Sequence, residues 1–219
     1  MFKLYETPIS PYVRKVKMVL HEKGLPYESQ PVDLLGDENL RPEYLALNPF
    51  HRVPVLRDGD VVLFESTAIN EYLEEKYPEP ALLPRDPVRR AQARAWEEAS
   101  DAYFGPCLGG LVRETFMNPA GPDPAALEQH KTQLAEYLTA LDRQLNGKDY
   151  VVGTFSVADI ALGIAISVLP MFGISLDPYP NVARWLPTIQ ARDSFKKAQP
   201  TPEFMAELMA RVQARRGAR

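Results

Sequence analysis

The spacing of hydrophobic positions divides the chain into two parts of different character. In the first part, short apolar runs predict strands, and apolar residues at helical spacing between them predict helices. The tripeptide Asp58-Gly59-Asp60 between the last two runs is typical of a β-hairpin turn. The predicted order is β-α-β-α-β-β-α, with strands near 2–5, 25–32, 53–56 and 61–64, and helices ending near Gly24, over 40–47 and starting at Ser66.

The second part is predicted to be entirely helical. A proline-dense stretch, residues 77–87, separates it from the first part and cannot continue a helix. We therefore expect an α/β module at 1–77, a linker at 78–88 and an all-α module at 89–219. The expected helices lie near residues 88–117, 123–146, 156–169, 180–192 and 202–214.

Composition narrows the class of protein. The chain has 219 residues, 45% hydrophobic and 25% charged, which is ordinary for a globular protein. A net charge of -4 offers no basic field for nucleic acid. The single cysteine, Cys107, forms no intramolecular disulfide, and neither a signal peptide nor a membrane span is visible. We expect a cytoplasmic protein without nucleic-acid or membrane contacts. The three histidines lack metal-ligand spacing, so no metal is expected.

The first candidate site follows the first strand. In Thr7-Pro8-Ile9-Ser10-Pro11, Ser10 stands at a helix N-cap and Pro11 at the first helical position. A hydroxyl there lies beside free backbone N–H groups and the positive end of the helix dipole, a good place to stabilise a thiolate. A lone Ser-Pro is more commonly a simple cap, so the neighbouring sites decide between the two roles.

Two further segments carry candidate chemistry. Pro54 enters a strand, and a cis Val53-Pro54 bond, although rarer than trans, would turn the Val53 backbone outward to pair with an extended peptide. Glu65 and Ser66 open a helix whose bare amides suit a carboxylate, and Glu65 suits an ammonium. Arg52, with His51 beside it, suits a second carboxylate. Together the sites describe a receptor for a cysteine-containing peptide.

These segments carry a resemblance to a known family. Their order and spacing resemble the glutathione S-transferase superfamily over nearly the whole chain. The resemblance implies an α/β thioredoxin-like N-terminal domain followed by an all-α C-terminal helical domain, the glutathione S-transferase fold. The matching strings are Ser10–Val16, Glu22–Glu28, Asn48–Leu56, Glu65–Ile69 and, as a buried N-capping box, Ser156–Ile160.

The resemblance also implies roles for individual residues. In serine-type branches, such as theta-like, phi and tau members, the serine at the position of Ser10 donates a hydrogen bond to the glutathione sulfur. Tyr5 matches the tyrosine that other branches use, but Ser10 is favoured because it lies at a helix dipole. The implied glutathione contacts are the backbone at Val53 and Pro54, the γ-glutamyl ligands Glu65 and Ser66, basic Arg52 near the glycyl carboxylate, and His51, where a small residue is common.

The electrophile pocket is the least specific part of this interpretation. The family places it between the modules, where the same residues more often serve simply as core. A glycine-rich segment, Gly105–Gly110, could kink the long helix there. The residues expected to line the pocket are Tyr12, Tyr103, Phe104, Cys107, Leu111 and Phe116.

The expected protein is a homodimeric glutathione transferase that conjugates glutathione, its cosubstrate, to small hydrophobic electrophiles in detoxification. One alternative is a non-catalytic binding or regulatory protein of the same fold, as in stringent-starvation-type relatives. Another is a glutathione-dependent isomerase or peroxidase. The serine- and cysteine-rich string of zeta-type isomerases is absent, which ranks the isomerase low.

Overall fold

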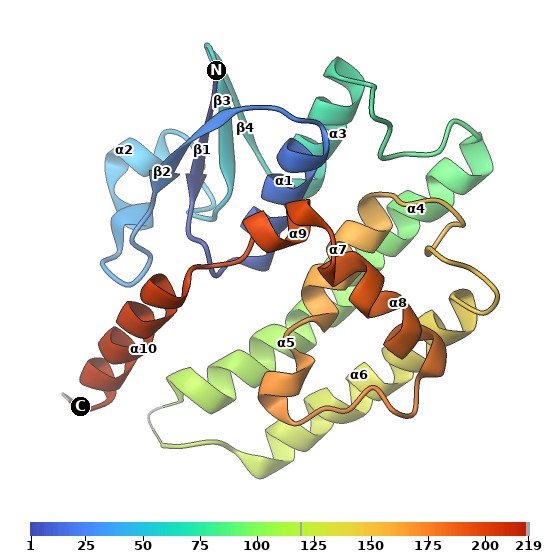
Figure 1. Ribbon diagram of the computed structural model, residues 1–219. Helices are drawn as coiled ribbons and strands as arrows, with labels where there is room; N and C mark the ends of the chain where they lie inside the picture. Colours follow the sequence, from blue (N-terminus) through green and yellow to red (C-terminus); the bar gives the residue numbers. More distant parts are fainter. Residues whose placement is uncertain (119, 218–219) are drawn as a thin grey trace. The chain divides into compact units, whose positions relative to one another are not determined.

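The computed structural model describes residues 1–118 and 120–217, and the side chains of that range up to residue 214 (Figure 1). The chain divides into two compact units. One unit comprises Met1–Arg85 together with Ala191–Gln199, and the other comprises Asp86–Gln190 with Pro200–Arg219.

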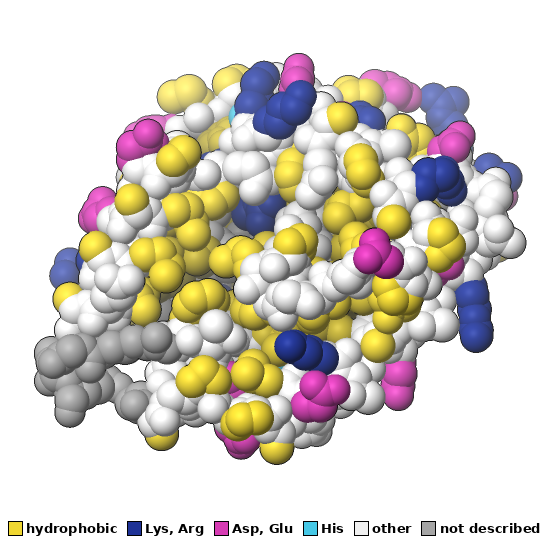
Figure 2. Space-filling view, turned by 60° about the horizontal axis from the view of Figure 1, so that its bottom comes forward, with side chains coloured by type: hydrophobic (Ala, Val, Ile, Leu, Met, Phe, Trp, Pro, Cys, Tyr) yellow, Lys and Arg dark blue, Asp and Glu magenta, His cyan; other side chains and the backbone are white. Residues whose placement is uncertain are grey.

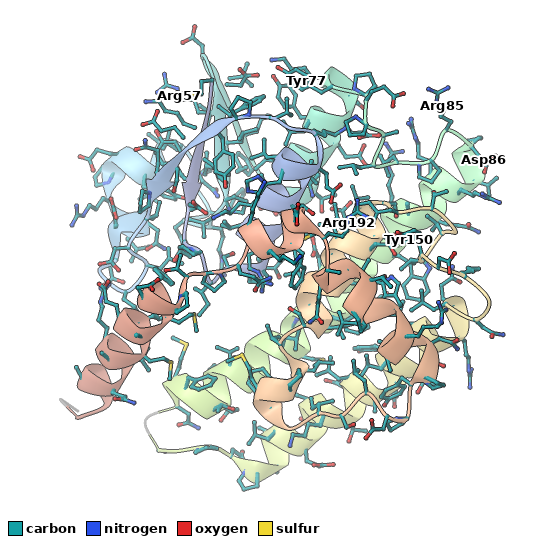
Figure 3. The ribbon with its side chains drawn as sticks, viewed as in Figure 1. Arg57, Tyr77, Arg85, Asp86, Tyr150 and Arg192 are labelled. Carbon is teal, nitrogen blue, oxygen red and sulfur yellow. The ribbon has the colours of Figure 1, made fainter. Side chains whose placement is uncertain are left out.

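The first unit is built on a four-stranded mixed sheet. Its strands lie in the order β2-β1-β3-β4, with β1 parallel to β2 and antiparallel to β3, and β3 antiparallel to β4. Asp58 pairs with Val61, so Gly59 and Asp60 form a two-residue turn in which Gly59 has a φ of 60°. Arg57 donates to the Gly59 carbonyl beside this turn (Figure 3). The four predicted strands are confirmed as β1 (Phe2–Glu6), β2 (Tyr27–Pro31), β3 (Val55–Asp58) and β4 (Val61–Phe64).

Helices cover both faces of this sheet. Figure 1 shows α1 (Pro11–Glu22) and α3 (Ser66–Lys76) on one side, and α2 (Pro42–Leu45) on the other. A short 3-10 turn, η1 (Glu38–Leu40), precedes α2. The predicted β-α-β-α-β-β-α order is confirmed. A compact apolar cluster joins helices to strands through Val13, Val32, Tyr44, Val53 and Val55, with Tyr5, Leu47, Val62 and Phe64 packed against it.

A helix from the C-terminal part of the chain also belongs to the first unit. The five-residue α9 (Asp193–Lys197) packs against α1 and was absent from the predicted helices. Arg192, labelled in Figure 3, donates through Nε and Nη2 to the two carboxylate oxygens of Glu22 at 2.7 and 2.8 Å. The Ser194 hydroxyl donates to the same carboxylate. These contacts hold α9 on α1 although the residues are 170 or more positions apart.

The proline-dense stretch is anchored to the first unit by a buried ion pair. Lys23, at the C-cap of α1, lies 2.6 Å from Glu74 of α3. Its ammonium also donates to the carbonyls of Tyr77 and Pro80 at 2.7 and 2.9 Å. The Glu74 carboxylate accepts hydrogen bonds from the backbone N–H groups of Leu82 and Leu83. The stretch predicted as a linker is thus fixed at 77–83 by side chains of α1 and α3.

The second unit is helical, as predicted. One continuous helical segment covers residues 87–117 and includes two π-helical turns. The five predicted helices are confirmed to within a few residues, and a 3-10 turn, η4 (Leu169–Phe172), follows the third. The elements are α4 (Pro87–Ala99), η2 (Ser100–Phe104), α5 (Gly105–Val112), η3 (Arg113–Met117), α6 (Pro124–Gln144), α7 (Val157–Ile166), α8 (Pro180–Gln190) and α10 (Pro202–Gly217).

The glycine-rich segment of the long helix does not break it. Residues 105–112 are regular α-helix, and the irregular π turns flank them on either side. Gly110 instead admits a neighbouring helix, because a Cβ built there would lie 2.0 Å from Nε2 of His130 on α6. The glycine therefore serves helix–helix contact rather than a kink.

Helix α7 forms the centre of the second unit, and all ten of its residues are buried. Asp159 closes the predicted capping box by accepting from the Ser156 N–H and hydroxyl at 3.0 and 3.1 Å. It also accepts from the Val151 N–H and from the indole N–H of Trp185, both at 2.9 Å. Burial raises the pKa of Asp159 to about 6. The capping box expected over Ser156–Ile160 is confirmed.

The exposed surface mixes side chains of both charges. On the face shown in Figure 2, lysine and arginine side chains are scattered among acidic and hydrophobic ones, without a continuous basic field. Among the described helices, none combines the length and apolar composition that a bilayer crossing requires.

Candidate functional site

Ser10 occupies the predicted N-cap of α1. Its Oγ accepts a hydrogen bond from the Val13 N–H at 3.4 Å, and its own N–H donates to the Thr7 carbonyl at 3.0 Å. Because the hydroxyl oxygen acts as the acceptor in the cap, its hydrogen remains available for donation to a ligand. Pro11 itself has no N–H. The other amides of the first turn and the helix dipole give positive potential at this point. The N-cap prediction is confirmed.

Tyr5 has a different environment. It lies on β1 within the apolar cluster, and its ring meets the Tyr44 ring edge-on, with centroids 6.3 Å apart. Tyr5 is therefore part of the sheet and does not stand at a helix terminus, where a dipole would assist a thiolate. Of the two hydroxyls considered from the sequence, this arrangement favours Ser10.

The loop before β3 has the backbone form considered from its sequence. The Val53-Pro54 peptide bond is cis. Val53 and Pro54 are both buried, while His51 and Arg52 are exposed and free to meet a ligand from solvent. In the described part of the chain, neither the N–H nor the C=O of Val53 takes part in a hydrogen bond. Those two groups are available to an extended peptide.

Three polar side chains that were not among the predicted site residues hold this loop. Tyr44 Oη and Asn48 Nδ2 both donate to the Arg52 carbonyl, at 2.7 and 2.9 Å. Asn48 Oδ1 accepts from the Phe50 N–H at 3.0 Å, and Asn39 Nδ2 donates to the His51 carbonyl at 2.9 Å. The signal available in the sequence was an asparagine directly before Pro49 at the end of a helical patch.

Helix α3 starts at Ser66, as predicted, and Glu65 occupies its N-cap. Glu65 has a φ of 68° and a ψ of 115°, an unusual backbone conformation for a residue with a side chain. Such conformations are concentrated at ligand sites. The Glu65 side chain is exposed and can meet an amino-acid head group, whereas Ser66 in the first turn of α3 is buried.

A buried lysine lies behind this helix start. Lys15 of α1 donates to the Thr67 hydroxyl at 3.2 Å, which places an ammonium beside the first turn of α3. Its charge adds to the helix dipole and favours an anion there. Thr67 is the second residue of α3.

The strand register brings the three segments together. Tyr5 of β1 pairs with Val55 of β3, and Val55 pairs with Phe64 of β4. The chain leaves β1 toward Ser10, enters β3 from Val53 and leaves β4 toward Glu65, all at this row of the sheet. One end of the sheet therefore carries the Ser10 hydroxyl, the Val53 backbone groups and the start of α3 at Glu65 and Ser66.

The residues expected to line an electrophile pocket occupy varied environments. Tyr12 of the first unit and Tyr103 of the second are exposed, and Phe116 is half-buried with its ring against Phe172. Phe104, Cys107 and Leu111 are buried.

Two of these buried residues contact α6. The Phe104 ring packs against the Tyr137 ring, with centroids 5.6 Å apart, and the Cys107 thiol donates to Gln133 at 3.4 Å. Burial raises the pKa of Cys107, which keeps it a thiol at neutral pH. Among the described residues, no three His, Cys, Asp or Glu side chains gather as metal ligands would.

Comparison with known proteins gives consistent matches. The glutathione S-transferase N-terminal domain model matches residues 4–81, and the C-terminal domain model matches residues 104–193. Glutathione S-transferase 3 of Zea mays is 39% identical over 204 residues, covering 89% of this chain and 91% of that protein. A maleylacetoacetate isomerase of Pseudomonas aeruginosa is 34% identical, covering 90% and 95%.

Solved structures agree with the sequence relatives. A glutathione transferase family member from Pseudomonas fluorescens, solved with two glutathione bound, superimposes with a TM-score of 0.81 at 28% identity, covering 90% of this chain and 91% of that one. Both domain models and a relative above one-third identity thus span most of the residues described. The chain belongs to the glutathione S-transferase family.

Proposed function

We propose that this protein is a glutathione transferase of serine type, in which Ser10 activates the thiol of bound glutathione. The observation that carries the proposal is the Ser10 N-cap, whose hydroxyl hydrogen is available beside the positive end of α1. A free cysteine thiol has a pKa of about 8.5. A hydrogen bond to the sulfur together with the helix dipole lowers it, which raises the thiolate fraction at neutral pH.

The remaining groups at this end of the sheet are assigned to the rest of glutathione. The Val53 backbone, shaped by Pro54, pairs with the cysteinyl residue. Glu65 receives the γ-glutamyl ammonium, and Ser66 with its neighbouring amides receives the adjacent carboxylate. Arg52 and His51, both exposed, receive the glycyl carboxylate.

The chemical step forms a bond between the glutathione sulfur and an electrophilic carbon. The thiol first releases its proton to solvent. In an addition, the attacked double bond gives its electrons to a neighbouring atom that then takes a proton; in a substitution, the leaving group departs with its bonding pair. We assign small hydrophobic electrophiles to the reaction. A cytoplasmic homodimer completes the proposal.

The test compares the wild type with Ser10→Ala and with Ser175→Ala. Ser175 is a matched control, because its hydroxyl also accepts from a backbone N–H, that of Asp177, but on an exposed loop of the other unit. The thiolate absorbance of bound glutathione is followed across pH. We expect the wild type and Ser175→Ala to lower the thiol pKa by about one unit or more, and Ser10→Ala to lose that shift. An equal pKa in all three proteins would overturn the role of Ser10 and direct attention to Tyr5.

A second candidate function rests on the isomerase relative. A glutathione-dependent isomerase would add the thiolate to a conjugated double bond, allow rotation, and expel the thiolate unchanged. Isomerisation of a maleyl-type diacid is measured beside conjugation of a halogenated aromatic compound. A kcat/KM that is higher for isomerisation would favour the isomerase. Failure to bind glutathione would favour a non-catalytic binding protein.

A further inference from the structure

The peptide unit between Arg52 and Val53 is held from one side by two buried donors. Tyr44 Oη and Asn48 Nδ2 both reach the Arg52 carbonyl oxygen, at 2.7 and 2.9 Å. Tyr44 is 5% exposed and Asn48 is 1% exposed. Two donors satisfy both lone pairs of this oxygen, so the carbonyl has a single well-defined direction.

That direction also determines where the Val53 N–H points. A peptide unit is planar, and in a trans unit the carbonyl and the following N–H point to opposite sides. The Arg52–Val53 bond is trans, because the cis bonds among the described residues are at Pro54 and Pro80. Holding the Arg52 oxygen on the side of Tyr44 and Asn48 therefore directs the Val53 N–H away from them.

Asn48 is bound at both ends of its amide. While Nδ2 donates to Arg52, Oδ1 accepts from the Phe50 N–H at 3.0 Å. The side chain thus spans the loop between residues 50 and 52 and is itself immobilised. Burial raises the pKa of the Tyr44 hydroxyl, so it remains a donor throughout the physiological range.

We propose that Tyr44 and Asn48 are positioning residues that orient the Val53 amide for pairing with the peptide backbone of the thiol substrate. This inference rests on the proposed function, in which Val53 receives the cysteinyl residue of glutathione. Neither side chain touches the substrate. They reduce the cost of binding, because a preorganised amide loses less freedom when the peptide arrives.

The test uses the full chain and three variants. Tyr44→Phe removes only the hydroxyl donor. Asn48→Asp keeps the acceptor used by Phe50 but replaces the amide donor with a second acceptor. Tyr72→Phe is the matched control, since it deletes a tyrosine hydroxyl of the same unit that donates to Asp58 at 2.7 Å, outside the loop. Thermal unfolding of each protein establishes that it is folded.

Three quantities are measured: the glutathione Kd by calorimetry, the pKa of the bound thiol at saturation, and the 15N relaxation order parameter of the Val53 amide. We expect Tyr44→Phe to raise Kd about fivefold, Asn48→Asp to raise it at least as much, and Tyr72→Phe to leave it unchanged. The bound-thiol pKa stays at the wild-type value in all variants, because Ser10 is intact. The order parameter falls at Val53 but not at Val55.

Wild-type affinity in folded Tyr44→Phe and Asn48→Asp would overturn the inference. So would weaker binding with an unchanged order parameter at Val53, because the two residues would then act on the fold in general. If the wild type itself fails to bind glutathione, the proposed function fails, and the Val53 order parameter still decides whether the two donors orient this amide.

Discussion

Lys23 and Glu74 form an ion pair that is closed to solvent, with 2.6 Å between Nζ and Oε2 and side chains 0% and 6% exposed. Both charged groups also form hydrogen bonds to the backbone. The ammonium also donates to two carbonyls, at Tyr77 and Pro80, and the carboxylate accepts from two backbone N–H groups. The pair therefore fastens the chain that leaves α3 to the end of α1.

The first prediction concerns this pair. Glu74→Gln removes one charge and leaves the buried ammonium uncompensated, so we expect it to lower the free energy of unfolding by about 3–5 kcal/mol. Glu79→Gln is the matched control, because Glu79 pairs with Arg85 on the surface, at side-chain exposures of 67% and 88%. It is expected to cost under about 1 kcal/mol. Urea denaturation measures both, and similar costs for the two variants would contradict the prediction.

The second prediction concerns the docking of α9. Burial opposes ionisation of Glu22, but hydrogen bonds from Arg192 and Ser194 outweigh it and lower its pKa below the ordinary value. The stability this carboxylate contributes is therefore present above the pKa of the unfolded state and is lost as pH falls through the folded-state pKa. We expect Glu22→Gln to increase amide hydrogen exchange in α9 at neutral pH.

Asp193→Asn serves as the control for α9, because its pairing with Lys196 is exposed and local. Protection in α9 is expected to remain at the wild-type level in this variant. Equal exchange in wild type and Glu22→Gln would show that Phe195 and the apolar contacts alone hold the helix.

The third prediction concerns Asp159. Its pKa is raised by burial to about 6, so between about pH 4 and 6 the folded protein binds more protons than the unfolded chain. The contribution of this group to the free energy of unfolding falls as pH rises through that window, by about 3 kcal/mol in total. Asp159→Asn lacks the titration. The free energy of unfolding of the wild type, relative to that of the variant, should therefore fall as pH rises from 4 to 7. A difference that stays constant over this range would refute the assignment.

The fourth prediction compares two neighbouring glycines. Gly110→Ala places a methyl group against the His130 ring, 2.0 Å from Nε2, and is expected to destabilise the protein by about 1–3 kcal/mol. A Cβ at Gly109 meets nothing within 4 Å, so Gly109→Ala is expected to be neutral or to stabilise by up to about 1 kcal/mol. Thermal unfolding distinguishes them. Adding His130→Ala to Gly110→Ala should recover part of the lost stability. In the wild-type background, His130→Ala should not stabilise the protein.

The fifth prediction concerns activity. The exposed Arg52 is assigned to the glycyl carboxylate of glutathione, so Arg52→Ala should raise the glutathione KM about tenfold while kcat stays within about twofold. Arg41→Ala, which removes another exposed arginine of the same unit, should change neither constant. A fall in kcat at unchanged KM would place Arg52 in the chemical step instead.

Local signals explain why much of this protein was predictable from its sequence. The strands, the Asp-Gly hairpin and the Ser10 cap each depend on a few neighbouring residues, whose spacing and backbone preferences act over short distances. The burial of α7 was predictable because nearly all of its residues, apart from Asp159, are apolar. The start of α3 at Ser66 was predicted correctly, but capping preference alone did not reveal that Glu65 occupies its N-cap.

Two features that only the tertiary structure decided depend on partners far apart in the sequence. Helix α9 has five residues, too few to be stable alone, and exists because Glu22 and the rest of α1 receive it. The burial of Lys23 beside Glu74 depends likewise on contacts that no local pattern encodes. Apart from α9, the sequence by itself determined the main helices and strands, and it supplied the residue types of the proposed glutathione site. Only the structure showed that Tyr44 and Asn48 both donate to the Arg52 carbonyl, although they lie just eight and four positions before it, because no simple spacing pattern encodes the course of a loop.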